Sequence, residues 1–445
     1  MPLLELIATA PMGLESIVAR ELKDLGYTDQ TVENGRVTFR ADASAIARCN
    51  LWLRTSDRVL VKMGQFRAVT FDELFEGTKA LDWPDWIPGN AEFPVEGRSH
   101  KSQLSSVPAC QGIVKKAVVE KMKERYGTEW FLETGARFVI EVSLLNDIAT
   151  LTMDTTGVGL HKRGYRKLVT EAPLKETMAA ALVLLSRWRV DRPLYDPFCG
   201  SGTIPIEAAM IGWNLAPGIR RSFASEAWPN VPEALWADAR EEAFDLVRDD
   251  IPLEIAGSDI DPEAVDVALA AAKAAGLGKE LRFHAEPVAK VRPRGDYGCI
   301  VTNPPYGERL GDRSEVETVL RQLGSVARSL PTWSVFVLNP NKQVEHYLAA
   351  LPTKSESCST VGSSAITTST LALCLREIRN SRLIKKCYCL RCTRTASLTL
   401  PMMRTGTVSS FITPFPYRMR KRMFCSPLGS PSVMDISFLS NNSPL

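Results

Sequence analysis

The stretch Arg192-Pro193-Leu194-Tyr195-Asp196-Pro197-Phe198-Cys199-Gly200-Ser201-Gly202-Thr203 decides the fold of this chain. An apolar run ends at Asp196, a glycine-rich turn follows, and a helical pattern then runs from Ile204 to Met210. Strand, turn and helix in this order open a nucleotide-binding α/β unit. Gly200 and Gly202 lack a Cβ, so the backbone can turn tightly and approach a ligand. Because the spacing is not G-x-G-x-x-G, the turn does not favour a dinucleotide.

Two later stretches repeat this arrangement of an apolar run that ends in polar residues. Ile255-Ala256-Gly257-Ser258-Asp259-Ile260-Asp261 ends in acids, and Cys299-Ile300-Val301-Thr302-Asn303-Pro304-Pro305-Tyr306-Gly307 ends in Asn-Pro-Pro-Tyr. Open α/β sheets bind ligands at the carboxyl ends of their parallel strands. We therefore expect the three strand ends to meet at one crevice.

The order D-P-F-C-G-S-G-T, G-S-D-I-D and N-P-P-Y-G-E-R-L resembles the class I S-adenosylmethionine-dependent methyltransferases that modify exocyclic amino groups. More narrowly, it resembles the bacterial ribosomal-RNA guanine-(2-amino) methyltransferases with an N-terminal THUMP domain. The resemblance covers roughly residues 1–350. It implies an α/β fold: a Rossmann-like class I methyltransferase domain, preceded by a small α+β region of ferredoxin-like and THUMP type that binds RNA.

The resemblance also implies S-adenosyl-L-methionine as the cofactor. A carboxylate at the end of the second strand can accept hydrogen bonds from both ribose hydroxyls. Asp259 is favoured for this role, because Asp261 before Pro262 also suits a helix N-cap. Glu286 is assigned to the adenine amino group by resemblance alone. The expected cofactor-binding residues are Asp196, Phe198, Gly200, Gly202, Thr203, Asp259, Asp261, Glu286 and Asn303.

The Asn-Pro-Pro-Tyr stretch is predicted to be catalytic through Asn303, Pro304, Pro305 and Tyr306. An exocyclic amine is a poor nucleophile, because its lone pair is delocalised into the ring. Acceptors on the Asn303 side chain and the Pro304 carbonyl would bind the amine hydrogens, and the two prolines would keep these acceptors in place. The ring of Tyr306 offers a surface on which an extruded base can stack. The alternative interpretation of Asn-Pro-Pro-Tyr is a rigid turn after a strand, with no catalytic role.

Periodicity divides the 445 residues into four segments. The connection between Asp196 and Asp259 is longer than one helix crossover needs, and the surplus at roughly 212–250 is predicted to pack on the methyltransferase domain. The predicted segments are a ferredoxin-like module over 1–62, a THUMP domain over 63–158, a methyltransferase domain over 165–351 and an atypical tail over 352–445.

Basic residues in two places are candidates for RNA binding. One is a predicted helix with Val114, Val118 and Met122 on one face and lysines on the other, and the second is the connector from Gly159 to Lys167. Simple charge adds Arg98, His100 and Lys101. A solvated helix face and a plain connector remain the alternatives. The predicted RNA-binding residues are Lys115, Lys116, Lys162, Arg163 and Arg166.

The net charge of +3 is uneven along the chain. Residues 352–445 hold thirteen Lys and Arg and three Asp and Glu, a net of +10, which leaves −7 for residues 1–351. RNA binding must therefore use local basic patches. The sequence has no apolar run of 18 residues and no signal-peptide pattern, so we expect a cytoplasmic protein without a membrane span. No metal is expected, because C-x-C-x-x-C at Cys387 lacks a well-spaced second pair.

The tail departs from the family pattern. It loses periodicity and holds sixteen Ser and eleven Thr in 94 residues. We hypothesise a disordered segment or one read out of frame beyond about residue 350, which would leave the methyltransferase domain incomplete, without its sixth and seventh strands. Resequencing this region tests the hypothesis, and an intact frame would exclude it.

The resemblance implies a methyltransferase that modifies the 2-amino group of a guanine in large-subunit (23S) ribosomal RNA during rRNA processing. Two alternatives stay open: an adenine-6-amino methyltransferase of DNA or RNA, and an inactive RNA-binding protein with a truncated catalytic core. The sequence determines neither the modified nucleotide nor the oligomeric state.

Overall fold

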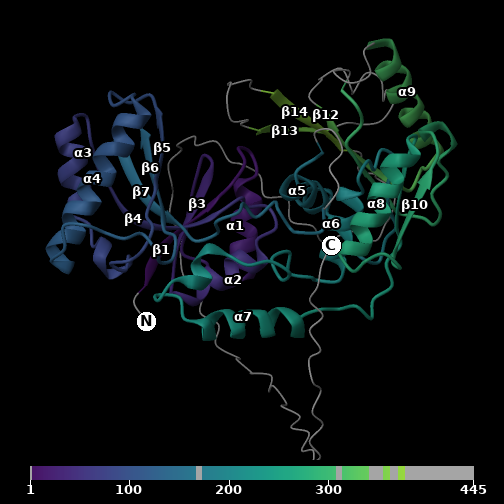
Figure 1. Cartoon of the computed structure of the whole chain (residues 1–445). Helices are drawn as coiled ribbons and strands as arrows, with labels where there is room; N and C mark the ends of the chain where they lie inside the picture. The colour runs from purple at the N-terminus through teal and green to yellow at the C-terminus, as the bar shows by residue number, and fades with distance from the viewer. Residues whose placement is uncertain (1–2, 167–172, 307–312, 340–353, 361–368, 376–445) are drawn as a thin grey trace, which may run out of the picture. The chain divides into compact units, whose positions relative to one another are not determined.

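The structure, a computed structural model, describes residues 3–166, 173–306, 313–339, 354–360 and 369–375. These residues build two sheets of seven strands each (Figure 1). None of the helices in the described ranges combines the length and apolarity needed to cross a membrane.

The first sheet joins the two N-terminal modules. Its order is β2-β3-β1-β4-β7-β6-β5, and β4 pairs antiparallel with both β1 and β7. This shared strand makes one continuous sheet from segments that the sequence divides near residue 62. The strands are β1 (Leu4–Thr9), β2 (Gln30–Glu33), β3 (Arg36–Ala41), β4 (Val59–Arg67), β5 (Val95–His100), β6 (Val139–Leu145) and β7 (Ile148–Asp154).

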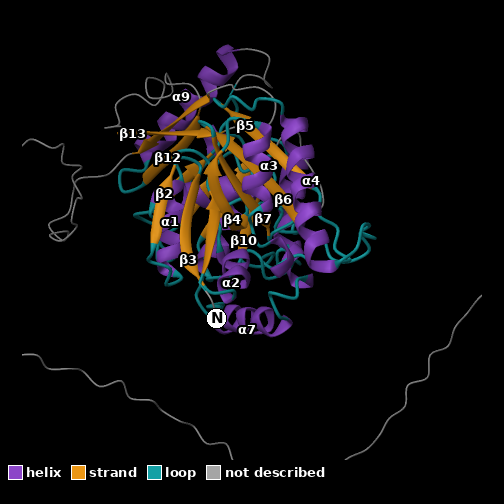
Figure 2. Ribbon diagram, turned by 90° about the vertical axis from the view of Figure 1, so that its left-hand side faces the viewer, coloured by secondary structure: helices purple, strands orange, loops and turns teal. Residues whose placement is uncertain are grey.

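Helices pack on one face of this sheet (Figure 2). Side chains alternate between the two faces of a strand, and Leu6, Val61 and Val142 of one set are buried in the core with residues of these helices. The opposite set includes Thr9, Arg36 and Ser143, which lie outside that core. The helices of the two modules are α1 (Glu15–Asp24), α2 (Ser44–Trp52), α3 (Phe71–Lys79) and α4 (Val107–Tyr126), with the 3-10 turn η1 (Trp83–Asp85).

The second sheet has the order β10-β9-β8-β11-β12-β14-β13. Strands β8 to β12 run parallel, and β14 is antiparallel to β12. This is the Rossmann-like methyltransferase sheet that the sequence predicts. Its strands are β8 (Leu194–Asp196), β9 (Ile255–Asp259), β10 (Leu281–Ala285), β11 (Cys299–Thr302), β12 (Ser334–Asn339), β13 (Lys354–Thr360) and β14 (Ser369–Leu375). Its helices are α5 (Glu176–Ser186), α6 (Thr203–Gly212), α8 (Pro262–Ala274) and α9 (Arg313–Ser329), with the 3-10 turn η3 (Val288–Lys290).

The sixth and seventh strands correct one expectation from the sequence. The methyltransferase sheet was expected to be incomplete beyond residue 351, yet β14 pairs with β12 and β13 pairs with β14. The serine and threonine content hid a short alternation of Leu371, Leu373 and Leu375, which is typical of a strand. Residues 376–445, including Cys387, lie outside the described residues, and the reading-frame hypothesis stays a prediction.

The insertion between β8 and β9 corrects a second expectation. It was predicted to pack on the methyltransferase domain, but its η2 (Ala224–Ala227) and α7 (Glu233–Asp245) segment reaches the N-terminal modules. Helix α7 lies beside α2 (Figure 1). The ring of Trp228 stacks on Phe138 with centroids 4.4 Å apart, and Arg48 Nε lies 2.7 Å from Glu242 Oε2. Apolar composition predicts burial but not the partner, so the sequence could not show this contact.

Candidate functional site

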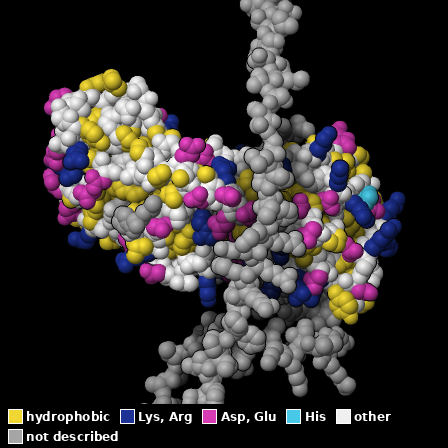
Figure 3. Space-filling view, turned by 90° about the horizontal axis from the view of Figure 1, so that it is seen from below, with side chains coloured by type: hydrophobic (Ala, Val, Ile, Leu, Met, Phe, Trp, Pro, Cys, Tyr) yellow, Lys and Arg dark blue, Asp and Glu magenta, His cyan; other side chains and the backbone are white. Residues whose placement is uncertain are grey.

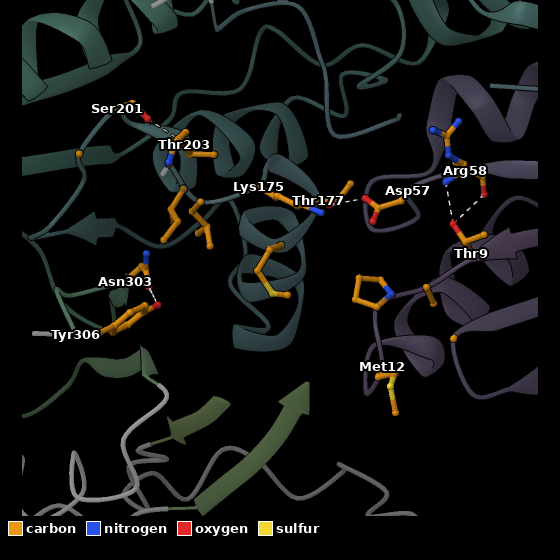
Figure 4. A pocket seen from close by; sticks show the side chains of 18 of the residues that line it. Thr9, Met12, Asp57, Arg58, Lys175, Thr177, Ser201, Thr203, Asn303 and Tyr306 are labelled. Atoms are coloured by element: carbon orange, nitrogen blue, oxygen red, sulfur yellow. Dashed lines mark hydrogen bonds between the residues drawn. The ribbon is translucent and has the colours of Figure 1, made fainter. Parts of the chain in front are cut away.

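Three polar strand ends meet at one edge of the second sheet. Strand β8 pairs with β9 on one side and β11 on the other. The Thr302 hydroxyl donates to Asp196 Oδ1 at 2.6 Å, and the Gly200 N–H donates to Asp259 Oδ2 at 2.9 Å. Asp196, Gly200, Asp259 and Asn303 all line one cavity of about 1960 Å³. Figure 4 shows this cavity, with Asn303 and the Ser201 and Thr203 side chains beside the glycine turn. The crevice therefore joins the glycine turn, the second acid and the Asn-Pro-Pro-Tyr stretch.

The two glycines of the turn have different physical roles. Both have positive φ, 50° at Gly200 and 74° at Gly202, where side chains are strained. A Cβ on Gly202 would lie 2.9 Å from Ala268 Cβ and 3.0 Å from Phe283 Cζ, so this glycine allows the turn to pack against α8 and β10. A Cβ on Gly200 would meet no described atom within 4 Å, so this glycine opens the backbone toward the cavity.

Asp196 is a buried acid at the centre of the crevice. Its Oδ1 also accepts from the Phe198 N–H at 3.1 Å. Burial, with a smaller contribution from the nearby Asp259, raises the pKa of Asp196 to about 7, although the hydrogen bonds from Thr302 and Phe198 oppose the shift. The side chain can therefore change its protonation state near neutral pH.

We expect the affinity for S-adenosylmethionine to increase as the pH rises from about 6 to about 8. The positive sulfonium favours the ionised carboxylate, so binding lowers the pKa of Asp196, and each pKa unit of coupling corresponds to about tenfold in affinity. In the free protein the raised pKa has the opposite consequence: folding stability falls as the pH rises from the ordinary value of 3.8 through about 7.

Isothermal titration calorimetry of the wild-type protein and Asp196→Asn measures this effect. S-adenosylhomocysteine lacks the sulfonium charge and should show a weaker pH dependence. An unchanged pH profile in Asp196→Asn would assign the titration to another group.

The structure shows where three other predicted cofactor residues lie. Phe198 lines the cavity. Asp261 also lines it, while its carboxylate accepts from the Glu263 N–H at 2.9 Å as the N-cap of α8. Glu286 differs from the expectation: its Oε1 accepts from the Tyr195 hydroxyl at 3.0 Å, and the next residues, Pro287 and Val288, line the cavity. We therefore do not assign Glu286 to the adenine.

Arg163 is an interior residue and does not fit the predicted phosphate clamp. It is 3% exposed, and its Nη1 donates to the Leu160 carbonyl at 2.6 Å. Its Nη2 donates to the Arg54 carbonyl of the first module, and its Nε lies 3.5 Å from Glu207 Oε1 on α6. A buried guanidinium with these partners joins the first module to the helix after the glycine turn. Lys162 beside it is exposed and stays a candidate for RNA binding.

Arg166 likewise faces the protein rather than an RNA surface. Its Nη2 donates to Thr203 Oγ1 at 2.6 Å and to the Leu174 carbonyl at 3.0 Å. Its Nη1 lies 3.4 Å from Glu176 Oε1. Thr203 is the first residue of α6 and lines the cavity. Arg166 therefore holds the end of the glycine turn against α5.

Arg166→Gln should raise the KM for S-adenosylmethionine about tenfold and leave the KM for RNA near the wild-type value. The substitution removes charge-assisted hydrogen bonds, each worth about 1.5–3 kcal/mol, that position the turn. Initial rates with each substrate varied in turn measure the split, and Lys162→Gln serves as the matched control in the same connector. A higher KM for RNA with an unchanged KM for the cofactor would restore the phosphate role.

The lysines of α4 are engaged in local packing. Lys115 Nζ lies 3.5 Å from the centroid of the Phe93 ring and 2.6 Å from Glu133 Oε1. Lys116 Nζ lies 5.7 Å from the centroid of the Phe75 ring. These contacts favour the alternative of an ordinary helix face for Lys115 above all. The sequence missed cavity residues of the first module, such as Met12 and Arg36, because strand periodicity does not show what a sheet faces.

Asn303 and Tyr306 are in direct contact at the wall of the cavity. The Tyr306 hydroxyl donates to Asn303 Oδ1 (Figure 4). Pro304 and Pro305 also line the cavity. The hydroxyl directs the carboxamide oxygen, which keeps a second lone pair for another donor. Cys199 in the neighbouring turn is not a nucleophile candidate, because burial raises the pKa of its thiol. Among the described residues, no group of three or more His, Cys, Asp and Glu could hold a metal ion.

Comparison with known proteins agrees with this arrangement. Residues 5–60 match the RlmL ferredoxin-like domain, residues 68–154 match the THUMP domain, and residues 163–368 match the RMKL-like methyltransferase domain. The chain is 52% identical over 351 residues to YpsC of Bacillus subtilis, which its name describes as a proposed RNA methyltransferase. That match covers 78% of this chain and 91% of YpsC.

Two solved structures resemble the whole arrangement. A protein of Listeria monocytogenes described as a predicted N6-adenine-specific DNA methylase has 51% identity and a TM-score of 0.79, over 85% of this chain and 97% of that one. SMU.472, described as a proposed methyltransferase in complex with SAH, has 41% identity and a TM-score of 0.80, over 86% and 100%. The chain belongs to the RlmL-like family of THUMP-domain methyltransferases, with S-adenosylmethionine as its cofactor.

Proposed function

We propose that this protein transfers a methyl group from S-adenosylmethionine to the 2-amino group of a guanine in 23S ribosomal RNA, in the cytoplasm. The observation that carries the proposal is the meeting of Asn303 with the glycine turn and Asp259 in one cavity. The opposite wall of that cavity belongs to modules of ferredoxin-like and THUMP type, which supports RNA as the substrate.

The chain's residues would act by position and by hydrogen bonding. Asn303 Oδ1 and the Pro304 carbonyl would accept the amine hydrogens, which concentrates the lone pair on nitrogen and directs it at the methyl carbon. S-adenosylmethionine, held by Asp259 and the glycine turn, would supply the electrophilic methyl group, and S-adenosylhomocysteine would be the neutral thioether product. The methylated nitrogen then loses a proton to an acceptor or to water. Tyr306 would stack on the extruded base.

Adenine-6-amino methylation is the second candidate. The Listeria structure is described as an N6-adenine-specific DNA methylase, and Asn-Pro-Pro-Tyr suits either exocyclic amine. The alternative of an inactive protein was based on an expected lack of the sixth and seventh strands. In the structure β13 and β14 occupy these places in the sheet, so the observation behind that alternative no longer applies.

Labelled S-adenosylmethionine offered with stripped ribosomal RNA or duplex DNA tests the proposal. We expect label in the RNA, and mass mapping should place it on a guanine 2-amino group. Label on adenine in either nucleic acid would instead support the second candidate, adenine-6-amino methylation. No label in either, with intact S-adenosylhomocysteine binding, would overturn the proposal.

A further inference from the structure

We propose that the face of the first sheet opposite helices α1 to α4 binds the unpaired RNA nucleotides that flank the target base. This inference rests on the proposed function and specifies its substrate as a single-stranded or extruded segment. The surface, called the platform below, consists of the cavity-lining residues Thr9, Arg36, Thr152, Ser143, Arg98 and His100.

The platform and the catalytic residues share one cavity. Strands β3, β1, β4, β7, β6 and β5 all contribute residues to the wall that faces Asn303. The cavity volume is about 1960 Å³, whereas sites for single small molecules measure about 300–1,000 Å³. A cofactor and one base would leave space unfilled beside the platform. The site therefore has room for further nucleotides on either side of the target.

The chemistry of the platform fits a sugar–phosphate backbone. The Ser143 hydroxyl accepts from Arg98 Nε at 3.0 Å and can donate to a phosphate oxygen or a ribose 2′-hydroxyl. At one edge, Arg36 Nε lies 2.8 Å from Glu33 Oε2. Toward the other edge, Arg98 Nη2 lies 2.9 Å from Glu141 Oε1, and its side chain is 62% exposed. The Arg98 pair is exposed and therefore weak, whereas the Arg36 side chain is 21% exposed. Because a guanidinium has five N–H groups, each arginine can bind a phosphate in addition to its acidic partner.

The Arg36 edge is held in place before any RNA binds. The Gly13 N–H donates to Glu15 Oε2 at 2.8 Å, and the Gly35 N–H donates to Glu15 Oε1 at 2.9 Å. Glu15 thus joins the loop after β1 to the turn before Arg36, and Met12 of that loop also lines the cavity. A fixed edge reduces the ordering cost of binding.

Charge alone does not select this surface, because Arg36 lies beside Glu33 and Arg98 beside Glu141. Acidic and basic side chains are also interspersed on the face of the molecule that Figure 3 shows from below. Continuity with the catalytic cavity selects it instead. Nucleic-acid bases that undergo chemistry must leave their stack, and sequence-specific RNA recognition mostly targets unpaired segments. We therefore assign the platform to unpaired nucleotides rather than to duplex.

Arg36→Ala and Arg98→Ala test the platform, with Arg40→Ala and Arg137→Ala as matched controls. Arg40 is on the same strand as Arg36, its side chain is 61% exposed, and it pairs with Glu5. Arg137 has a 58% exposed side chain and pairs with Glu92. Both controls lie outside the set of residues that line the cavity.

The readout is binding of a fluorescent single-stranded fragment of ribosomal RNA, by anisotropy over a range of salt concentrations. Each platform variant should reduce the slope of log K against log salt by about 0.7 and weaken binding, because one phosphate contact is lost. Both controls should keep the wild-type slope, and all four should keep the wild-type KM for S-adenosylmethionine. Arg98→Lys, which keeps the charge, should keep most of the slope.

Wild-type slopes in both platform variants would overturn the inference, as would equal losses in the controls. Tighter binding of duplex than of single-stranded RNA would also overturn it. These results are independent of catalysis. If the wild-type protein methylates guanine while the platform variants bind RNA normally, the platform fails and the proposed function stands. If no RNA is methylated but the slopes change as expected, the proposed function fails alone.

Discussion

Asn303→Ala should lower kcat about 10²- to 10³-fold, which is the usual cost of removing one preorganised hydrogen-bonding group from a catalytic site. The carboxamide oxygen is directed by the Tyr306 hydroxyl and lies at the wall of the cavity. Without it, the amine hydrogens lose an acceptor and the lone pair stays delocalised into the ring. Single-turnover methylation of ribosomal RNA with saturating cofactor measures the effect.

Two variants separate acceptor loss from general damage. Tyr306→Phe keeps the ring but removes the hydroxyl, so it should cost less than Asn303→Ala, and Asn303→Asp keeps oxygen acceptors and should retain part of the rate. The affinity for S-adenosylhomocysteine should change less than about threefold in all three variants. The reason is that they remove an interaction made in the transition state and not one that binds the cofactor. A loss of cofactor affinity equal to the loss of rate would move Asn303 from the catalytic role to the cofactor site.

Sequence reasoning located the strand ends because local composition determines them. An apolar run that ends in Asp196, Asp259 or Asn303 identifies a parallel strand and the edge at which its polar residue emerges. The glycine turn was equally visible, since positive φ at Gly200 and Gly202 restricts these positions to glycine. Each of these signals is contained within a few consecutive residues, so no knowledge of distant packing was needed.

The errors arose where distant packing decides the role of a residue. The sequence around Arg163 and Arg166 predicted a basic connector that binds RNA. In the structure the two arginines instead bind Glu207 and Thr203, about forty residues away in the sequence. Trp228 was expected on the methyltransferase domain and instead stacks on Phe138 of the THUMP region. The strand at Leu371 was hidden in a serine- and threonine-rich composition. In each case the local pattern could not identify a partner that lies far away in the sequence.

The second large effect is expected at Asp259. Asp259→Ala should weaken binding of S-adenosylmethionine and S-adenosylhomocysteine about 10²-fold, because a hydrogen bond to a charged group contributes about 1.5–3 kcal/mol and more than one is lost. Its Oδ2 accepts from the Gly200 N–H at 2.9 Å and its Oδ1 accepts from the Asp261 N–H at 3.1 Å. The substitution therefore loosens the glycine turn as well as removing the acceptor proposed for the ribose hydroxyls.

Calorimetry with both ligands and kcat at saturating cofactor measure the consequences. The affinities should fall together, while kcat should stay within about threefold of wild type, because Asp259 acts before the methyl transfer. Asp266→Ala is the matched control, since it removes an exposed carboxylate from α8, the helix that follows Asp261. Asp259→Asn should recover little, because its amide group would place a donor against one of two backbone N–H groups. A variant with normal affinities and a low kcat would show that Asp259 contributes to the transfer itself, and the ribose assignment would then fail.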